Sequence, residues 1–307
     1  MASILTNTNA MAALSTLRSI ASDMSTTQDR ISSGLKVGSA SDNAAYWSIA
    51  TTMRSDNKAL GAVSDALGMG AAKVDTAYAG MEAAIDVMTE IKAKVIAAKE
   101  EGVDKAKVQE EVTQLLDQLK SIGTGASFNG ENWLVTDGSA TSKSVVSGFV
   151  RDGEGNVSVK TTSYATDKAS LLYTVDADGA VVDDTGILNA VGNDQTIAGV
   201  DYTQLSVLAL DVSNQNLDDA LYSVELALDS MTSAGSKLGS LSSRIDMQTD
   251  FADKLSDAID SGVGRLVDAD MNEESTRLKA LQTQQQLAVQ ALSIANSDSQ
   301  NILSLFR

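Results

Sequence analysis

The side chains that most often carry out enzyme chemistry are missing from this sequence. Its 307 residues include no Cys and no His. This absence removes thiol nucleophiles, imidazole bases, disulfides and nearly every kind of zinc site. Carboxylates are plentiful, because 41 Asp and Glu stand against 23 Lys and Arg. Any catalytic or metal site would therefore have to be built from acids alone.

The acids are not grouped as such a site requires. Three pairs of neighbouring acids are candidates for acid–base work or metal binding: Asp183–Asp184, Asp218–Asp219 and Glu273–Glu274. Neighbours on a helix do not face one another, and no second cluster supports any of the pairs. We therefore expect solvated or helix-capping carboxylates at all three places.

Two other motifs also lack the residues that their chemistry needs. The run that begins at Asp176 has the look of a calcium loop, but its twelfth position is Ile187 where a bidentate Glu is required. Gly68-Met69-Gly70 has no strand before it and no Lys after it, so it is not a phosphate loop. The sequence predicts no enzyme, no cofactor and no metal. A protease inserted into the middle of the chain is a third alternative, opposed by the lack of His and Cys.

The composition favours long helices and excludes several classes of partner. There is no Pro, which would break helix interiors, and aromatic residues make up only 4%. The net charge of −18 argues against nucleic acid, whose phosphates would be repelled. No run of 18 apolar residues exists, so we expect no membrane insertion. The first residues also lack the basic and apolar regions of a cleavable signal peptide.

The charge and the apolar residues both set the two ends apart from the middle. Residues 1–40 carry a net charge of +1 and residues 273–307 carry none, so residues 41–272 hold −19. Both ends show apolar stripes with alternating spacings of four and three, which are typical of helices packed along their length. One stripe contains Ala10, Leu14, Leu17, Ala21, Met24, Gln28, Ile31 and Leu35. The other contains Leu278, Leu281, Gln285, Ala288, Leu292, Ala295, Ser299, Ile302 and Phe306.

Capping residues predict where the helices begin and end. Gly34 and Gly38 are expected to end the first helix, and Ser41 to cap a second that runs to about Gly102. Asp104 is expected to cap a third helix. Asn216 and Asp270 are expected to precede the last two, of which the first covers 217–260.

Between residues 128 and 212 the pattern changes to strands and turns. Residues 144–150 and 157–164 predict one hairpin, residues 171–175 and 180–182 a second, and residues 204–212 a further strand. The fold class is therefore mainly α with a small β-rich insertion. We expect an elongated, coiled-coil-like helical bundle in which the N- and C-terminal helices pair. Terminal stripes that one domain cannot bury need further copies, and repeated contacts that do not close generate filaments.

Three separated motifs resemble those of bacterial flagellins. DRISSGLKVGSASDNAAYWSIA matches the family pattern from Arg30 through Gly34, and then at Ser39, Ala40, Asp42, Ala44 and Ala45. SFNGENWL at 127–134 resembles the family's Phe-Asn-Gly turn. The end of the chain matches at Ala295, Asn296, Gln300, Asn301, Leu303 and Leu305. The sequence departs from the family pattern at Gly38, Asn43, Tyr46 and Trp47. In these departures it resembles the flagellins of soil and plant-associated alphaproteobacteria.

The resemblance implies three domains. Residues 1–40 and 270–307 would form the inner tube, residues 41–134 and 211–269 a rod, and residues 135–210 its β-rich outer part. Ser33, Gly34, Gly38 and Ser39 would form the linker between tube and rod. Tyr46 and Trp47 would contact neighbouring subunits, or alternatively pack within their own chain. The filament core would be packed by Leu14, Leu17, Met24, Ile31, Leu278, Leu281, Leu292, Ile302 and Leu305.

The resemblance also implies a function and partners. The chain would polymerise into the extracellular flagellar filament for swimming, after secretion without a cleaved signal. Its partners would be copies of itself, other flagellins, an export chaperone and the hook–filament junction proteins. The alternative is that the chain is itself a junction protein of the same assembly.

One segment departs from the family where hosts detect it. Flagellins recognised by animal Toll-like receptors carry Gln-Arg-Val-Arg-Glu-Leu-Ala-Val on the first rod helix. This sequence has TEIKAKVI there, namely Thr89, Glu90, Ile91, Lys92, Ala93, Lys94, Val95 and Ile96. Glu90 reverses a charge, and Lys94 places a charge where the motif is apolar. We expect poor receptor activation. The alternative is that the segment has drifted under selection for packing alone.

Overall fold

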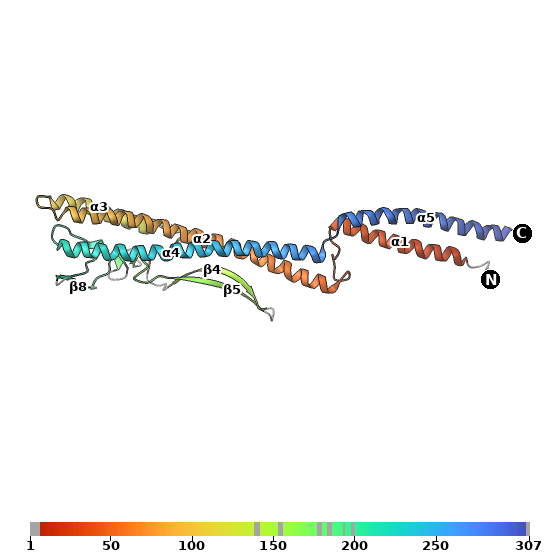
Figure 1. The fold of residues 1–307 in the computed structure, drawn as a ribbon, viewed down its shortest axis with the longest axis horizontal. Helices are drawn as coiled ribbons and strands as arrows, with labels where there is room; N and C mark the ends of the chain where they lie inside the picture. The colour runs from red at the N-terminus through yellow and green to blue at the C-terminus, as the bar shows by residue number, and fades with distance from the viewer. Residues whose placement is uncertain are drawn as a thin grey trace. The chain divides into compact units, whose positions relative to one another are not determined.

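A computed structural model describes residues 7–137, 142–152, 156–176, 180–182, 186–192, 194–197 and 200–304. Most of these residues lie in α1 (Thr8–Ser33), α2 (Ala44–Ala97), α3 (Lys105–Gly125), α4 (Leu217–Val267) and α5 (Met271–Ser304). The strands lie between α3 and α4 in the sequence (Figure 1). This is the mainly α fold with a β-rich insertion that the sequence predicts.

The chain divides into two compact units, which are described separately below. The first unit comprises residues 1–58 and 256–307, and the second comprises residues 59–255. Both α2 and α4 contribute a section to each unit. The division into tube, rod and outer part concerns the assembled subunit and remains a prediction.

In the first unit, α1 and α5 lie side by side and run in opposite directions (Figure 1). Near the start of α1, the side-chain amide of Asn7 donates a hydrogen bond of 2.9 Å to the carbonyl oxygen of Ala295. Near its end, the Arg30 guanidinium lies 3.1 Å from a carboxylate oxygen of Glu274. The predicted pairing of the terminal helices is therefore present within one chain.

The contact between α1 and α5 follows a stripe slightly different from the predicted one on α1. Leu17, Met24 and Ile31 are shielded as expected. Ile20 and Thr27 are buried, whereas Leu14 is exposed. The contact thus uses positions 13, 20 and 27 in place of 14, 21 and 28. Positions 13, 20 and 27 lie on one side of positions 17, 24 and 31 on the helix surface, and positions 14, 21 and 28 lie on the other side. The sequence alone could not show which of these two sides faces α5.

On α5 the predicted stripe is the shielded one. Its least exposed residues include Leu278, Leu281, Gln285, Ala288, Leu292 and Ala295. Leu281 is the most buried of them, at 8% exposed. The last members of the predicted stripe, Ser299, Ile302 and Phe306, lie beyond position 297, where the side chains are outside the described set.

The breaks between α1 and α2 and between α4 and α5 lie against each other. Gly34 ends α1 with a left-handed φ of 73°, which suits a residue without Cβ. The amides of Lys36 and Val37 then donate hydrogen bonds to the carbonyl of Val267, and the amide of Ala269 donates one to Gly34. Neither break is therefore a loose connection.

The caps predicted for α3 and α5 are present, but the cap predicted for α2 is not. Asp104 accepts a hydrogen bond from the amide of Ala106 at the start of α3, and Asp270 accepts one from Asn272 at the start of α5. Ser41 does not cap α2. Asn43 caps the helix instead and accepts hydrogen bonds from the amides of Ala45 and Tyr46. The residue between Ser41 and Asn43, Asp42, accepts hydrogen bonds from the loop before it.

In the second unit, α2, α3 and α4 enclose an apolar core. Residues exposed by 0% are found on all three helices, including Leu67, Met81, Met88, Leu119, Met231 and Leu238. Asn216 precedes α4 and accepts a hydrogen bond from the amide of Asp218, as predicted. The helix continues to Val267, seven residues beyond its predicted end at 260, and passes through Gly262 and Gly264, neither of which takes a positive φ.

The β-rich insertion consists of short pairs of strands. The strands are β1 (Ser127–Phe128), β2 (Glu131–Asn132), β3 (Val135–Thr136), β4 (Ser142–Arg151), β5 (Val157–Ala165), β6 (Tyr173–Val175), β7 (Val181–Val182), β8 (Gln195–Ile197) and β9 (Val200–Tyr202). The pairs β1–β2, β4–β5, β6–β7 and β8–β9 are antiparallel, and β3 pairs with β6 in parallel. Both predicted hairpins, β4–β5 and β6–β7, are present.

The predicted strand at 204–212 is wrong. The segment has no ladder partner among the described strands, and Val207–Ala209 forms one turn of 3-10 helix. Its apolar residues Val207, Leu210 and Val212 are buried against the helices. Gln109 of α3 bonds the Leu210 carbonyl at 3.1 Å and the Val212 amide at 2.7 Å. The apolar run therefore reflected burial and not strand pairing.

Candidate assembly surface

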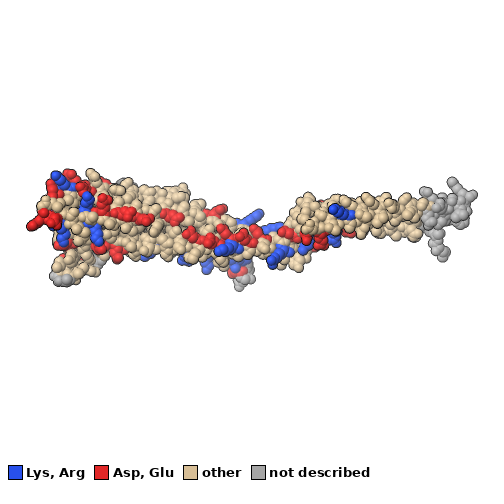
Figure 2. Space-filling view, turned by 45° about the horizontal axis from the view of Figure 1, so that its top comes forward, with Lys and Arg blue, Asp and Glu red and all other residues tan. Residues whose placement is uncertain are grey.

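The outer face of the α1–α5 pair is uncharged over most of its length. Residues 8–17 of α1 and 280–297 of α5 contain no Asp, Glu, Lys or Arg. In the space-filling view, the described part of this pair carries few charged atoms on the visible face (Figure 2). Gln, Ser, Thr and Ala fill the positions between the apolar residues.

Large apolar side chains on this face are left exposed by the described residues of a single chain. On α5, Ile294 is 68% exposed, Leu287 59% and Val289 53%, and on α1 Met11 is 64% exposed. Leu14 is also left exposed by the described residues of its own chain. Isolated exposed apolar residues are common, but several on one uncharged helix pair indicate an interaction surface.

Glu274 is the acid that the sequence analysis placed wrongly. It was expected to be solvated or to cap a helix, yet only 6% of its side chain is exposed, and it pairs with Arg30. Its neighbour Glu273 is exposed. No sequence signal separated the two, because the pairing depends on which side of α5 faces α1.

The pair Asp218–Asp219 joins the start of α4 to neighbouring segments. Asp218 forms an ion pair with Lys99, and Asp219 accepts a hydrogen bond of 3.1 Å from the amide of Thr203. Asp183 and Asp184 lie outside the described residues. Within the described parts of the chain, no three acids are grouped where a metal ion could bind. No described helix is long and apolar enough to cross a membrane.

The predicted linker residues form an ordered turn. Asp42 accepts hydrogen bonds from the amides of Gly38 and Ser39 and from the Ser39 hydroxyl, at 2.9–3.1 Å. These bonds, chiefly those from Ser39, hold the pKa of the Asp42 carboxyl below its ordinary value. Ser33 donates a hydrogen bond of 2.7 Å to the Asp29 carbonyl, one turn earlier on α1.

Tyr46 and Trp47 lie exposed at the start of α2. They are 43% and 38% exposed, and Ile49 beside them is 49% exposed. Packing of both rings within their own chain is the alternative prediction. Contact with another copy remains a prediction.

The segment at 89–96 divides between core and surface. Ile91 and Val95 are fully buried. Lys92 pairs with Glu225 on α4, and Lys94 lies 2.6 Å from Glu111 on α3. The hydrogen bond with Glu111 raises the pKa of Lys94. Thr89, Glu90, Ala93 and Ile96 are exposed.

Comparisons with known proteins agree with these features. The family model of the bacterial flagellin N-terminal helical region matches residues 4–141, and that of the C-terminal helical region matches residues 221–306. The chain belongs to the bacterial flagellins. It is 51% identical to Flagellin A of Rhizobium meliloti and 44% identical to a flagellin of Brucella melitensis, in each case over the whole of both chains.

Membership of this family determines the general function. The protein is a structural subunit of the bacterial flagellar filament and assembles with copies of itself; it is not an enzyme. The relatives support a flagellin of alphaproteobacterial type. They give no support to the alternative of a hook–filament junction protein.

Proposed function

We propose that the α1–α5 pair is the part of this flagellin that packs against neighbouring subunits to form the filament core. The observation that carries the proposal is the uncharged face with Leu287, Val289 and Ile294 exposed. Such a face is costly in a soluble monomer and becomes favourable once copies cover it.

Membership of the flagellin family supports the rest of the proposal. Residues 41–134 and 211–269 form the rod, residues 135–210 its outer part, and Tyr46 and Trp47 contact an adjacent subunit near the linker. The packing set that includes Leu14, Leu17, Met24 and Leu292 belongs to this core, as do Ile302 and Leu305 by sequence. Leu305 lies outside the described residues.

A double substitution tests the proposed face. Leu287→Gln with Ile294→Gln removes two exposed apolar side chains without disturbing the seam to α1. Full burial of one such side chain is worth about 1.5–3 kcal/mol, so we expect the critical concentration for polymerisation to rise at least about 30-fold. Met247→Gln is the matched control, because Met247 is 61% exposed on α4. An unchanged critical concentration in the double variant would remove the support for this surface.

We further propose that the protein is secreted by the flagellar export route with the help of a chaperone, and that it meets junction proteins at the filament base. Co-assembly with other flagellins belongs to the same proposal, and the relatives include flagellins A, B, C and D of one Rhizobium meliloti strain. Mass spectrometry of filament subunits would show whether the N-terminal segment is retained, as secretion without cleavage requires.

We also propose that the segment at 89–96 makes this flagellin a poor ligand for the animal receptor. The support is local: Lys92 and Lys94 are held by acids of the same chain, and Glu90 presents a negative charge at the surface.

A further inference from the structure

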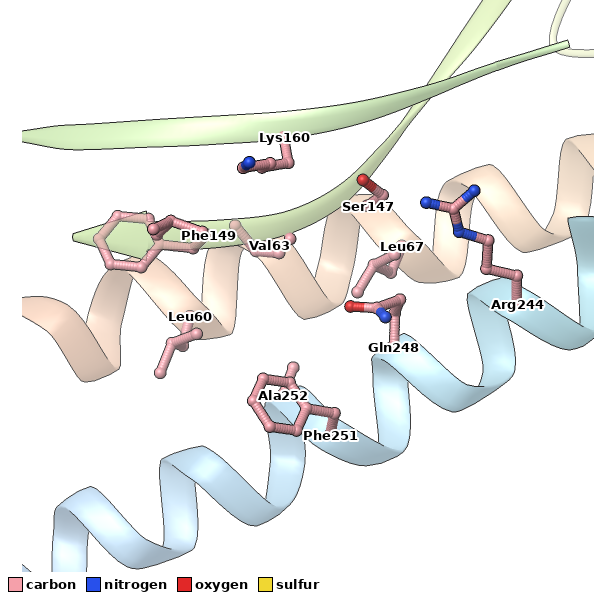
Figure 3. A pocket seen from close by; sticks show the side chains of 12 residues that line it. Leu60, Val63, Leu67, Ser147, Phe149, Lys160, Arg244, Gln248, Phe251 and Ala252 are labelled. Carbon is pink, nitrogen blue, oxygen red and sulfur yellow. The ribbon is translucent and has the colours of Figure 1, made fainter. Parts of the chain in front are cut away.

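A hollow lies between the β4–β5 hairpin and the helices in the second unit. The hairpin approaches α2 closely where Gly70 leaves room: a Cβ there would lie 2.3 Å from a methyl carbon of Val145. Further along, a cavity of about 250 Å³ remains beneath the hairpin. Its floor is apolar, with Leu60, Val63 and Leu67 of α2 all buried (Figure 3).

The rim of the hollow is positively charged. Lys160 of β5 and Arg244 of α4 lie on either side, with Gln248 between them (Figure 3). Among the described residues, no acid lines the hollow. Within the described residues, neither Lys160 nor Arg244 forms an ion pair. The rim thus presents two positive charges in a chain whose net charge is −18.

The open side of the hollow is apolar as well. Phe251 of α4 is 61% exposed at its edge, and Phe149 of β4 stands opposite (Figure 3). A β-bulge between Val146 and Gly148 bends the strand at this point. An occupant would therefore need an apolar side chain of moderate size, flanked by negative charge.

The turn between α2 and α3 has this chemistry. It presents Val103, which is 37% exposed, with Glu100 and Glu101 before it and Asp104 after it. Gly102 takes a left-handed φ of 94°, and the amide of Val103 donates to the Glu100 carbonyl at 3.4 Å. Of the neighbouring lysines, Lys99 pairs with Asp218 and Lys107 lies 4.0 Å from Asp104, while Lys105 is exposed.

A chain cannot place this turn in its own hollow. Leu67 at the hollow and Ala97 at the end of α2 belong to one uninterrupted helix. Thirty residues at 1.5 Å each separate them by about 45 Å. A second copy displaced along the helix axis by a similar distance would bring its turn to the hollow.

We propose that the turn at 100–104 of one subunit docks into the hollow between the hairpin and α2–α4 of a second copy. Val103 enters the apolar floor, and its acidic neighbours meet Lys160 and Arg244. The contact is heterologous, so each molecule offers one turn and one hollow, and repetition gives an open row with a step of about 45–50 Å. This inference rests on the proposed function, because it describes one contact within the filament.

Charge reversal tests the pairing. Lys160→Glu with Arg244→Glu reverses the hollow, and Glu100→Lys with Glu101→Lys reverses the turn. We expect each pair of substitutions to raise the critical concentration about tenfold, and the chain with all four to return within about twofold of the original. Glu110→Lys with Asp117→Lys is the control, since it changes exposed acids of α3 by the same charge and should have little effect.

Engineered cysteines test the geometry, which the absence of native Cys makes simple. Val103→Cys with Phe251→Cys in one chain should give a ladder of disulfide-linked oligomers when filaments are oxidised with diamide. Dilute monomer should give no such ladder, because its two thiols are about 45 Å apart. Val103→Cys with Tyr78→Cys, which is 40% exposed away from the hollow, is the control.

The outcomes separate the two proposals. Failure of the original chain to polymerise would contradict the proposed function itself. Normal polymerisation of both reversed pairs, with no ladder, would overturn the docking contact and leave the α1–α5 surface untouched. Loss of polymerisation in both pairs without rescue by the fourfold chain would show that the hollow takes something other than the turn.

Discussion

The buried ion pair between Arg30 and Glu274 should control the stability of the terminal helices in the monomer. The carboxylate is almost fully shielded, whereas 27% of the Arg30 side chain remains exposed. Removing one partner of a fully buried pair costs about 3–5 kcal/mol, but Arg30 can recover part of its hydration. We therefore expect Glu274→Ala to destabilise the pairing of α1 with α5 by about 2 kcal/mol.

Hydrogen exchange of the monomer is the suitable assay, because it reports opening of each helix separately. A loss of about 2 kcal/mol corresponds to protection factors lowered about 30-fold across residues 8–33 and 271–297. The core of the second unit should be unaffected. Glu274→Gln keeps a neutral acceptor for Arg30 and should cost about half as much.

The matched control is Glu273→Ala, which removes an exposed carboxylate from the same turn. It should change protection by no more than the few tenths of a kcal/mol that a charge near a helix terminus contributes. If Glu273→Ala and Glu274→Ala lowered protection equally, or neither did so, the reasoning from burial would be refuted.

Three further predictions can be checked on purified protein. Removal of residues 273–307 should abolish polymerisation while the second unit keeps its helical circular dichroism, and filaments of normal length from the truncated chain would contradict this. Replacing residues 89–96 with Gln-Arg-Val-Arg-Glu-Leu-Ala-Val should raise receptor activation at least about tenfold on responsive cells; equal potency would refute it. Burial raises the pKa of Tyr164 to about 12, so the folded state keeps its proton longer than the unfolded state does, and stability should fall by up to about 3 kcal/mol as pH rises from 10 to 12. Urea unfolding of Tyr164→Phe monomer across this range should show a smaller fall, and an identical fall would exclude Tyr164 as its cause.

The sequence predicted those parts of the fold that depend on local chemistry. Gly34, Asp104, Asn216 and Asp270 mark helix limits because capping needs only a few neighbouring residues. The β4–β5 hairpin followed from two alternating runs around an Asp-Gly turn. These signals are short-range, so they can be found without knowledge of the tertiary structure.

Apart from the cap of α2 and the end of α4, the failures depended on packing between distant segments. Burial of Glu274, the choice of Ile20 over Ala21, and the unpaired course of residues 204–212 are each decided by a surface that lies far away in sequence. The hollow beneath the hairpin belongs to the same class, because its rim joins Lys160 and Arg244 across 84 positions of sequence. No motif could have pointed to it.

The antiparallel course of α1 and α5 gives their pairing a direction. Arg30 lies in the last turn of α1 and Glu274 in the first turn of α5, so each charge complements its own helix dipole as well as the other charge. At the opposite end of the pair, the described residues form the neutral hydrogen bond of Asn7 with Ala295. Fraying should thus begin at the two chain termini and proceed toward Arg30 and Glu274. When a subunit joins the filament, the pairing of α1 with α5 would proceed in the opposite direction, from Arg30 and Glu274 toward the chain termini.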